Sequence, residues 1–216
     1  MSGRGPSASL GRGLLVTFEG GEGSGKSTQS ELLALRLEAG RWPIFRLREP
    51  GGTPLGEELR RLLLHHRAER SPEAELLLFL AARAELVRSV ILPALAANAI
   101  VICDRFSDST LSYQGFGRGL DIEQLTTLNR WATGGLTPDL TVLFDLPVAV
   151  GRRRNQTEDY AFEREDDAFH ERVRQGYLEL ARKEPERWLV LDGTQLPHEL
   201  ATFIGARVEA LISGSS

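Results

Sequence analysis

The chain has 216 residues, of which 41% are hydrophobic, enough to bury the core of one α/β domain. Its formal net charge of -4 argues against a general nucleic-acid coat protein, which usually carries a basic face. No apolar run approaches the roughly 20 residues that span a bilayer, and a single cysteine, Cys103, gives no disulfide framework, so we expect a cytoplasmic protein with no nucleic-acid or membrane partner.

The first elements along the chain are a tail, a strand and a helix. Residues 1–12 are mainly Gly, Ser, Arg and Pro, which predicts a disordered tail. The apolar run from Leu14 to Phe18 predicts a buried strand, and the leucines between Ser27 and Gly40 predict a helix that ends at the glycine. A glycine-rich turn connects the strand to the helix.

This turn fits the Walker A pattern of a phosphate-binding loop, Gly20-x4-Gly25-Lys26-Ser27. Its glycines let backbone N–H groups close around phosphate oxygens, Lys26 would reach the β and γ phosphates, and Ser27 would offer a hydroxyl to Mg²⁺. Chance alone is a poor explanation, because Lys26 is one of only two lysines in the chain. The predicted nucleotide-binding residues are Gly20, Gly21, Glu22, Gly23, Ser24, Gly25, Lys26, Ser27 and Thr28.

Strands and helices are expected to alternate over the rest of the chain. Further strands are predicted at 44–47, 100–104, 141–145 and 188–192. Helices are predicted at 54–65, from Ser71 to Pro93 or beyond, and near 121–133, 147–154, 166–184 and 197–212. The alternation indicates a three-layer α/β fold, in which a parallel sheet of about five strands carries helices on both faces. We expect one domain over residues 13–212.

Ligands of such a sheet bind beyond the carboxyl ends of its strands, where two acids are expected. Asp104 and Asp145 each end an apolar run, and either one would suit a water-mediated Mg²⁺ contact or a helix cap. Asp104 is favoured because Arg105, whose planar fork can hold phosphate, follows it directly. Arg48 and Arg83 are further candidates for phosphate contacts.

Two segments leave their roles open at this point. The run 152–154 consists of three arginines, which suit either catalysis or a basic helix end, and the polar residues after it predict a mobile lid at about 152–167. Residues 109–115 mix hydroxyls, a ring and an amide, so they suit either an ordinary turn or the edge of a base.

Taken together, the motifs resemble those of the bacterial thymidylate kinases over about residues 13–212. The residues that carry the resemblance are the loop 20–28, Arg48-Glu49-Pro50-Gly51-Gly52-Thr53, Phe79-Leu80-Ala81-Ala82-Arg83, Asp104-Arg105-Phe106 and Tyr113-Gln114-Gly115-Phe116-Gly117-Arg118-Gly119. The resemblance implies a P-loop kinase fold and Mg²⁺-dependent transfer of the ATP γ-phosphoryl group to dTMP, giving dTDP for dTTP synthesis. The family is also homodimeric.

The resemblance also implies roles for residues in the acceptor site. Glu22 would face the sugar hydroxyl, and Arg48 and Arg105 the acceptor phosphate. Phe79 would stack on thymine, Arg83 would bond its carbonyl edge, Thr110 and Gln114 would read other base positions, and Tyr113 would crowd a ribose 2′-hydroxyl. Residues 192–195 would form the adenine-side loop. The metal contacts would be Ser27 and Asp104.

One feature departs from the family. Its members place a catalytic arginine in the phosphate loop, where this chain has Gly23, or repeatedly in the lid, where this chain has Asn155-Gln156-Thr157-Glu158-Asp159. We choose Arg154 for this role. The predicted catalytic residues are therefore Lys26, Arg105, Arg154 and Glu22.

Two other functions are compatible with the sequence. A deoxynucleoside kinase would activate a hydroxyl with a positioned carboxylate, for which Glu22 is a candidate. A regulatory NTP-binding switch would bind no acceptor, and Arg48, Phe79, Arg83 and Gln114 would then have no role.

Overall fold

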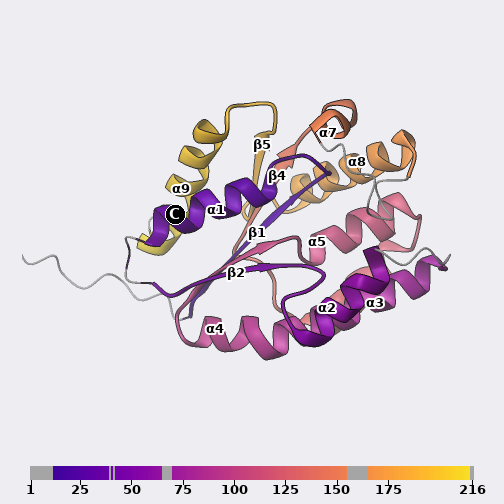
Figure 1. Ribbon diagram of the computed structural model, residues 1–216, viewed down its shortest axis with the longest axis horizontal. Helices are drawn as coiled ribbons and strands as arrows, with labels where there is room; N and C mark the ends of the chain where they lie inside the picture. The colour runs from indigo at the N-terminus through magenta and orange to yellow at the C-terminus, as the bar shows by residue number, and fades with distance from the viewer. Residues whose placement is uncertain (1–11, 39, 41, 65–69, 155–164, 215–216) are drawn as a thin grey trace, which may run out of the picture.

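The computed structural model describes residues 12–38, 40, 42–64, 70–154 and 165–214 (Figure 1). Five parallel strands form one sheet in the order β2-β3-β1-β4-β5. Each lies where the sequence predicts a strand, so the predicted fold class is confirmed. Their bounds are β1 Leu14–Gly20, β2 Ile44–Arg48, β3 Ile100–Asp104, β4 Leu140–Asp145 and β5 Trp188–Asp192.

The central strand β1 is buried over its whole length, which explains its largely apolar sequence. Phe18 pairs with Asp104 of β3, and Gly20 pairs with Phe144 of β4. The carboxyl ends of β1 and β3 are therefore nearly level. This register places the loop that follows β1 beside Asp104 and the residues after it.

One face of the sheet is covered by α1 (Lys26–Glu38) and α9 (Pro197–Ser213), which lie side by side in Figure 1. Val16 and Phe18 of β1 share a hydrophobic cluster with Leu33 of α1 and Ile204 of α9. The helix that carries Lys26 is thus fixed to the strand that precedes the phosphate loop.

The other face is covered by a long helical stretch of α3 (Pro72–Leu86), the π-helical η1 (Val87–Ile91) and α4 (Leu92–Ala96). Ser71 caps it by accepting a hydrogen bond from the Ala74 N–H, and the helix continues past Pro93 as predicted. The π-helical turn lies just before Pro93, which has no N–H to donate to the preceding turn. Leu15 of β1 packs against this layer.

The remaining helices lie near the predicted places, with one correction. They are α2 (Pro54–Leu64), α6 (Ile122–Thr133), α7 (Val148–Arg154) and α8 (Asp167–Lys183). The interpretation of 109–115 as a turn is wrong, because these residues form α5 (Ser107–Thr110) and the π-helical η2 (Leu111–Gly117). The glycines there permit close packing: a Cβ would lie 2.3 Å from Ile122 at Gly115 and 2.7 Å from Phe169 at Gly117.

Two predictions fall wholly or mainly on residues that the structure does not describe. Residues 1–11 of the predicted tail and 155–164 of the predicted lid lie outside the described ranges. Within those ranges, no helix is long and apolar enough to cross a membrane.

Candidate active site

The phosphate loop (residues 20–28) joins β1 to α1 and wraps around the side chain of Lys26. Gly20, Gly23 and Gly25 have φ values of 137°, 68° and 93°, which favour glycine. The Lys26 Nζ donates to the carbonyl oxygens of Gly20 and Gly21 at 3.2 and 2.8 Å. Burial lowers the pKa of this ammonium, and the positive charge of Arg105 lowers it further. The charge therefore lies within the loop that would receive phosphate.

The two predicted metal contacts lie together at the start of α1. Ser27 Oγ donates to Asp104 Oδ2 at 2.7 Å. By contrast, both carboxylate oxygens of Asp145 accept hydrogen bonds from Arg174, at 2.6 and 3.1 Å. Of the two acids that the sequence left open, Asp104 is therefore the one whose carboxylate contacts Ser27, whereas that of Asp145 is engaged by Arg174.

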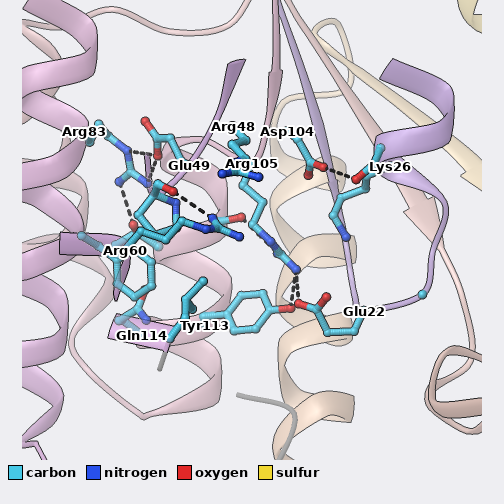
Figure 2. Close-up of a pocket in the computed structure, with 17 residues that line it drawn as sticks. Glu22, Lys26, Arg48, Glu49, Arg60, Arg83, Asp104, Arg105, Tyr113 and Gln114 are labelled. Atoms are coloured by element: carbon cyan, nitrogen blue, oxygen red, sulfur yellow. Dashed lines mark hydrogen bonds and ion pairs between the residues drawn. The ribbon is translucent and has the colours of Figure 1, made fainter. Parts of the chain in front are cut away.

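Arg105 connects the phosphate loop to the acceptor side of the site. Figure 2 shows its guanidinium between Glu22 and Tyr113: Nη2 forms an ion pair with Glu22 and donates to the Tyr113 hydroxyl at 3.1 Å. Its carbon Cζ lies 4.9 Å from the centre of the Tyr113 ring. Burial alone would raise the pKa of Glu22, but the charges of Arg105 and Lys26 outweigh it and lower that pKa.

Glu19, which sequence reasoning missed, supports the backbone that carries Arg105. Arg105 has a φ of 70°, and the N–H of the next residue, Phe106, donates to Glu19 Oε1 at 2.8 Å. Ser109 and Tyr177 donate to Glu19 Oε2 at 2.6 and 2.8 Å. Burial, with a contribution from the Asp108 charge, raises the pKa of Glu19 to about 7. The only signal in the sequence was an acid at the end of an apolar strand.

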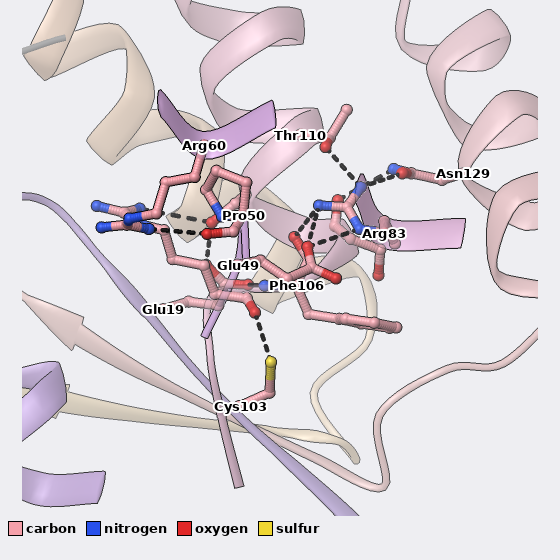
Figure 3. Close-up of polar contacts among 12 residues, drawn as sticks. Glu19, Glu49, Pro50, Arg60, Arg83, Cys103, Phe106, Thr110 and Asn129 are labelled. Carbon is pink, nitrogen blue, oxygen red and sulfur yellow. Dashed lines mark hydrogen bonds and ion pairs between the residues drawn. The ribbon is translucent and has the colours of Figure 1, made fainter. Parts of the chain in front are cut away.

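Arg83 lies in a second buried network (Figure 3). Its side chain is 1% exposed, and Nε and Nη2 both donate to Glu49 Oε2, at 2.8 and 2.6 Å. The other three N–H groups donate to Thr110, Asn129 and the Phe106 carbonyl. All five donors of Arg83 are therefore engaged in this structure. A bond to a base carbonyl would require one of them to be shared or exchanged.

Several of these groups line a cleft of about 360 Å³. The predicted phosphate-loop and metal residues in its lining are Glu22, Gly23, Lys26, Ser27 and Asp104. The predicted acceptor residues in its lining are Arg48, Phe79, Arg83, Arg105, Thr110, Tyr113 and Gln114. The remaining loop residues, Gly20, Gly21, Ser24, Gly25 and Thr28, surround Lys26 in the chain but are outside this lining. Arg60, which the sequence did not single out, also lines the cleft and donates to the Pro50 carbonyl oxygen at 2.8 Å.

Comparison with known proteins decides the family. A family model for thymidylate kinase matches residues 18–204. The chain belongs to the thymidylate kinase family. It is 51% identical over 183 residues to a thymidylate kinase of Kosmotoga olearia, covering 84% of this chain and 88% of the relative. It is 48% identical to a thymidylate kinase of Deinococcus radiodurans, covering 92% of this chain and 98% of the relative.

A solved structure supports the same assignment. The crystal structure of thymidylate kinase from Ehrlichia chaffeensis is 36% identical in sequence and superposes with a TM-score of 0.72. The match covers 93% of this chain and 98% of that chain. The resemblance to this family seen in the motifs is therefore confirmed over most of the chain.

This member of the thymidylate kinase family packs α7 closely against its phosphate loop. A Cβ on Gly23 would lie 2.5 Å from the Gly151 carbonyl oxygen, and a Cβ on Gly151 would lie 2.6 Å from the Glu22 carbonyl oxygen. A larger residue at 23 would therefore collide with backbone. Arg154, one turn beyond Gly151 in sequence, donates to the Gly193 carbonyl oxygen at 2.8 Å. It is not among the residues that line the cleft.

Proposed function

We propose that the protein is a thymidylate kinase, built as one kinase domain over about residues 13–212. It phosphorylates dTMP to dTDP, with ATP as the phosphoryl donor. The observation that carries this function is the contact between Glu22 of the phosphate loop and Arg105 of the acceptor side, in a chain of this family. Donor and acceptor phosphates would meet at this contact.

The chemistry requires positioning rather than a general base. A phosphate monoester has a second pKa near 6, so at neutral pH it is mostly a dianion and already nucleophilic. Arg48 and Arg105 supply positive charge to hold it. Glu22 is ion-paired with Arg105, and its lowered pKa makes it a poor base, which argues against a nucleoside kinase. A regulatory switch would leave the acceptor half of the cleft without a role.

Ser27 and Asp104 would hold Mg²⁺. A hydroxyl and a carboxylate are hard oxygen donors of the kind that Mg²⁺ takes, and magnesium in phosphoryl-transfer sites keeps waters and phosphate oxygens as further ligands. The described residues contain no cluster of three or more acidic, histidine or cysteine side chains that could bind a metal by themselves. This agrees with a metal that arrives with the nucleotide. The ion would neutralise charge on the phosphates.

Arg154 is our candidate for stabilising the transferring phosphoryl group. It follows Gly151, which packs on the phosphate loop, so a change of side-chain rotamer would point it towards the phosphates. We expect Arg154→Ala to lower kcat by at least about tenfold and to change ATP affinity less, because the charge develops in the transition state. Steady-state kinetics and calorimetric titration with an ATP analogue measure the two effects. Arg153→Ala, at an exposed neighbour, is the matched control; loss of affinity alone would mean that Arg154 only holds ground-state phosphate.

Base selection gives the test of the proposed function itself. We expect dTMP to be the preferred acceptor, dUMP to be weaker, and dCMP, ribonucleotides and free thymidine to be poor. The methyl group that dUMP lacks is worth only about 1 kcal/mol of apolar contact. The Tyr113 ring excludes ribose by its bulk, so Tyr113→Phe should keep this rejection. The measurement is kcat/KM across this panel, and equal values for dTMP and dCMP or thymidine would refute the assignment.

We also propose that the protein works as a homodimer. Helices α2, α3 and α6 pack against one another in series, and each carries an apolar side chain that is exposed in the single chain. Leu62 is 45% exposed, Leu77 is 59% exposed and Trp131 is 81% exposed. A second copy of the chain would cover such side chains.

A further inference from the structure

The side chain of Glu75 lies behind the end of the cleft that would receive the base of an acceptor nucleotide. It takes no part in the phosphoryl transfer proposed above. It is 6% exposed and belongs to α3, four residues before Phe79 and eight before Arg83. At this spacing the three residues share one face of the helix. Phe79 and Arg83 line the cleft, whereas Glu75 reaches it only through a neighbour.

That neighbour is Gln114 of η2. Gln114 Nε2 donates to Glu75 Oε1 at 2.9 Å, and Arg118 donates to the same carboxylate with Nε at 3.3 Å and Nη2 at 3.1 Å. Arg118 is itself fixed, because Nη1 donates to Glu165 at 2.6 Å and the guanidinium lies 4.9 Å from the Phe169 ring centre. Glu75 is thus held on one side by a cation and contacts the amide on the other.

An ionised carboxylate only accepts hydrogen bonds, so it can face only the nitrogen end of the Gln114 amide. The carbonyl oxygen Oε1 then forms the other end of the amide. It accepts no hydrogen bond from any residue in the described ranges, and Gln114 lines the cleft. In Figure 2, Gln114 lies at the end of the cleft away from Lys26, where the base of an acceptor nucleotide would be.

We propose that Glu75 is a specificity-determining positioning residue, which orients the Gln114 amide so that its carbonyl oxygen accepts the N3–H of thymine. The proposal rests on the proposed function, since it needs dTMP as acceptor. Thymine and uracil carry a hydrogen on N3, whereas cytosine has a lone pair there. An oxygen fixed in this orientation bonds the first two bases and repels the third. This selection does not depend on Arg83, whose five donors are already engaged.

The first experiment compares Glu75→Gln with the wild-type enzyme. The new side chain has nearly the same shape but can donate as well as accept, so Gln114 is free to turn its nitrogen towards the base. We expect kcat/KM to decrease for dTMP and to increase for dCMP. The ratio of the two values should fall at least tenfold. A merely structural role would lower both values together. Glu73→Gln, at an exposed glutamate in the same helix, is the matched control and should leave the ratio unchanged.

A double-mutant cycle tests whether Glu75 acts through Gln114. Gln114→Met removes both ends of the amide and should itself reduce the ratio. Adding Glu75→Gln to that variant should then change the ratio no further, whereas a second, additive fall would overturn the proposal. If Glu75→Gln does not fold, as judged by thermal unfolding, Glu75→Asp replaces it. Aspartate is still acceptor-only, and it should keep a larger ratio than Gln114→Met; an equal ratio would count against the proposal.

The outcomes separate this inference from the proposed function. A wild-type enzyme that does not phosphorylate dTMP refutes the function. A wild-type enzyme that prefers dTMP to dCMP, together with a folded Glu75→Gln variant of unchanged ratio, refutes the role of Glu75 alone.

Discussion

Lys26→Ala should lower kcat by at least about 100-fold and leave the protein folded. The Lys26 ammonium lies within the phosphate loop, where it donates to the carbonyl oxygens of Gly20 and Gly21. From there its positive charge is placed to stabilise the negative charge that develops on the transferring phosphoryl group. Alanine removes the positive charge of the ammonium. Gly20 is buried and Gly21 is partly exposed, so water can replace the ammonium at the Gly21 carbonyl, and we expect only a modest fall in the free energy of unfolding.

Three measurements isolate this effect. Release of ADP gives kcat, thermal unfolding reports the fold, and calorimetric titration with dTMP reports the acceptor site, which should still bind. The only other lysine provides the matched control: Lys183 is 59% exposed and pairs with Glu179 one turn earlier in α8. Lys183→Ala should therefore behave like the wild-type enzyme. A folded Lys26→Ala variant with near-normal kcat would show that the loop does not perform the reaction.

The sheet and the phosphate loop could be predicted because short-range patterns encode them. A parallel strand buried on both faces is largely apolar in sequence, as β1, β3 and β4 are. The loop is encoded by glycines and one lysine at fixed spacing. Asp104 ends such a strand and Arg105 comes directly after it. Their location at the carboxyl edge of the sheet could therefore also be predicted from the pattern.

The carboxylates that hold the arginines and amides could not be predicted in this way. Glu19, Glu49 and Glu75 contact partners that are 34 to 158 positions away in the sequence. A sequence shows that an acid is present, but it does not show which donor folding brings to it. The same limit applies to Gly115 and Gly117, whose sequence signal is that of a turn. Their actual requirement is close contact with Ile122 and Phe169, which only the tertiary structure reveals.

Arg105→Lys should lower kcat/KM for dTMP at least about tenfold, which corresponds to about 1.4 kcal/mol of transition-state binding. The two terminal nitrogens of Arg105 reach four oxygen atoms: the Glu22 carboxylate and the hydroxyls of Tyr113, Tyr177 and Ser109. A planar fork can exchange two of these partners for phosphate oxygens and bind the phosphate through two parallel N–H groups. A single ammonium on a flexible stem cannot reproduce that arrangement.

Backbone strain does not contribute to the difference between the two enzymes, because lysine at 105 would keep the same left-handed backbone, with φ near 70°. That conformation costs a residue with a Cβ about 1–2 kcal/mol, and the bond from Phe106 to Glu19 that supports it does not involve the side chain at 105. The substitution therefore changes only the group that faces phosphate. Arg182→Lys, at an exposed position in α8, is the matched control. If Arg105 acts in the transition state, kcat falls together with kcat/KM; unchanged kinetics in a folded Arg105→Lys variant would place this residue outside the reaction centre.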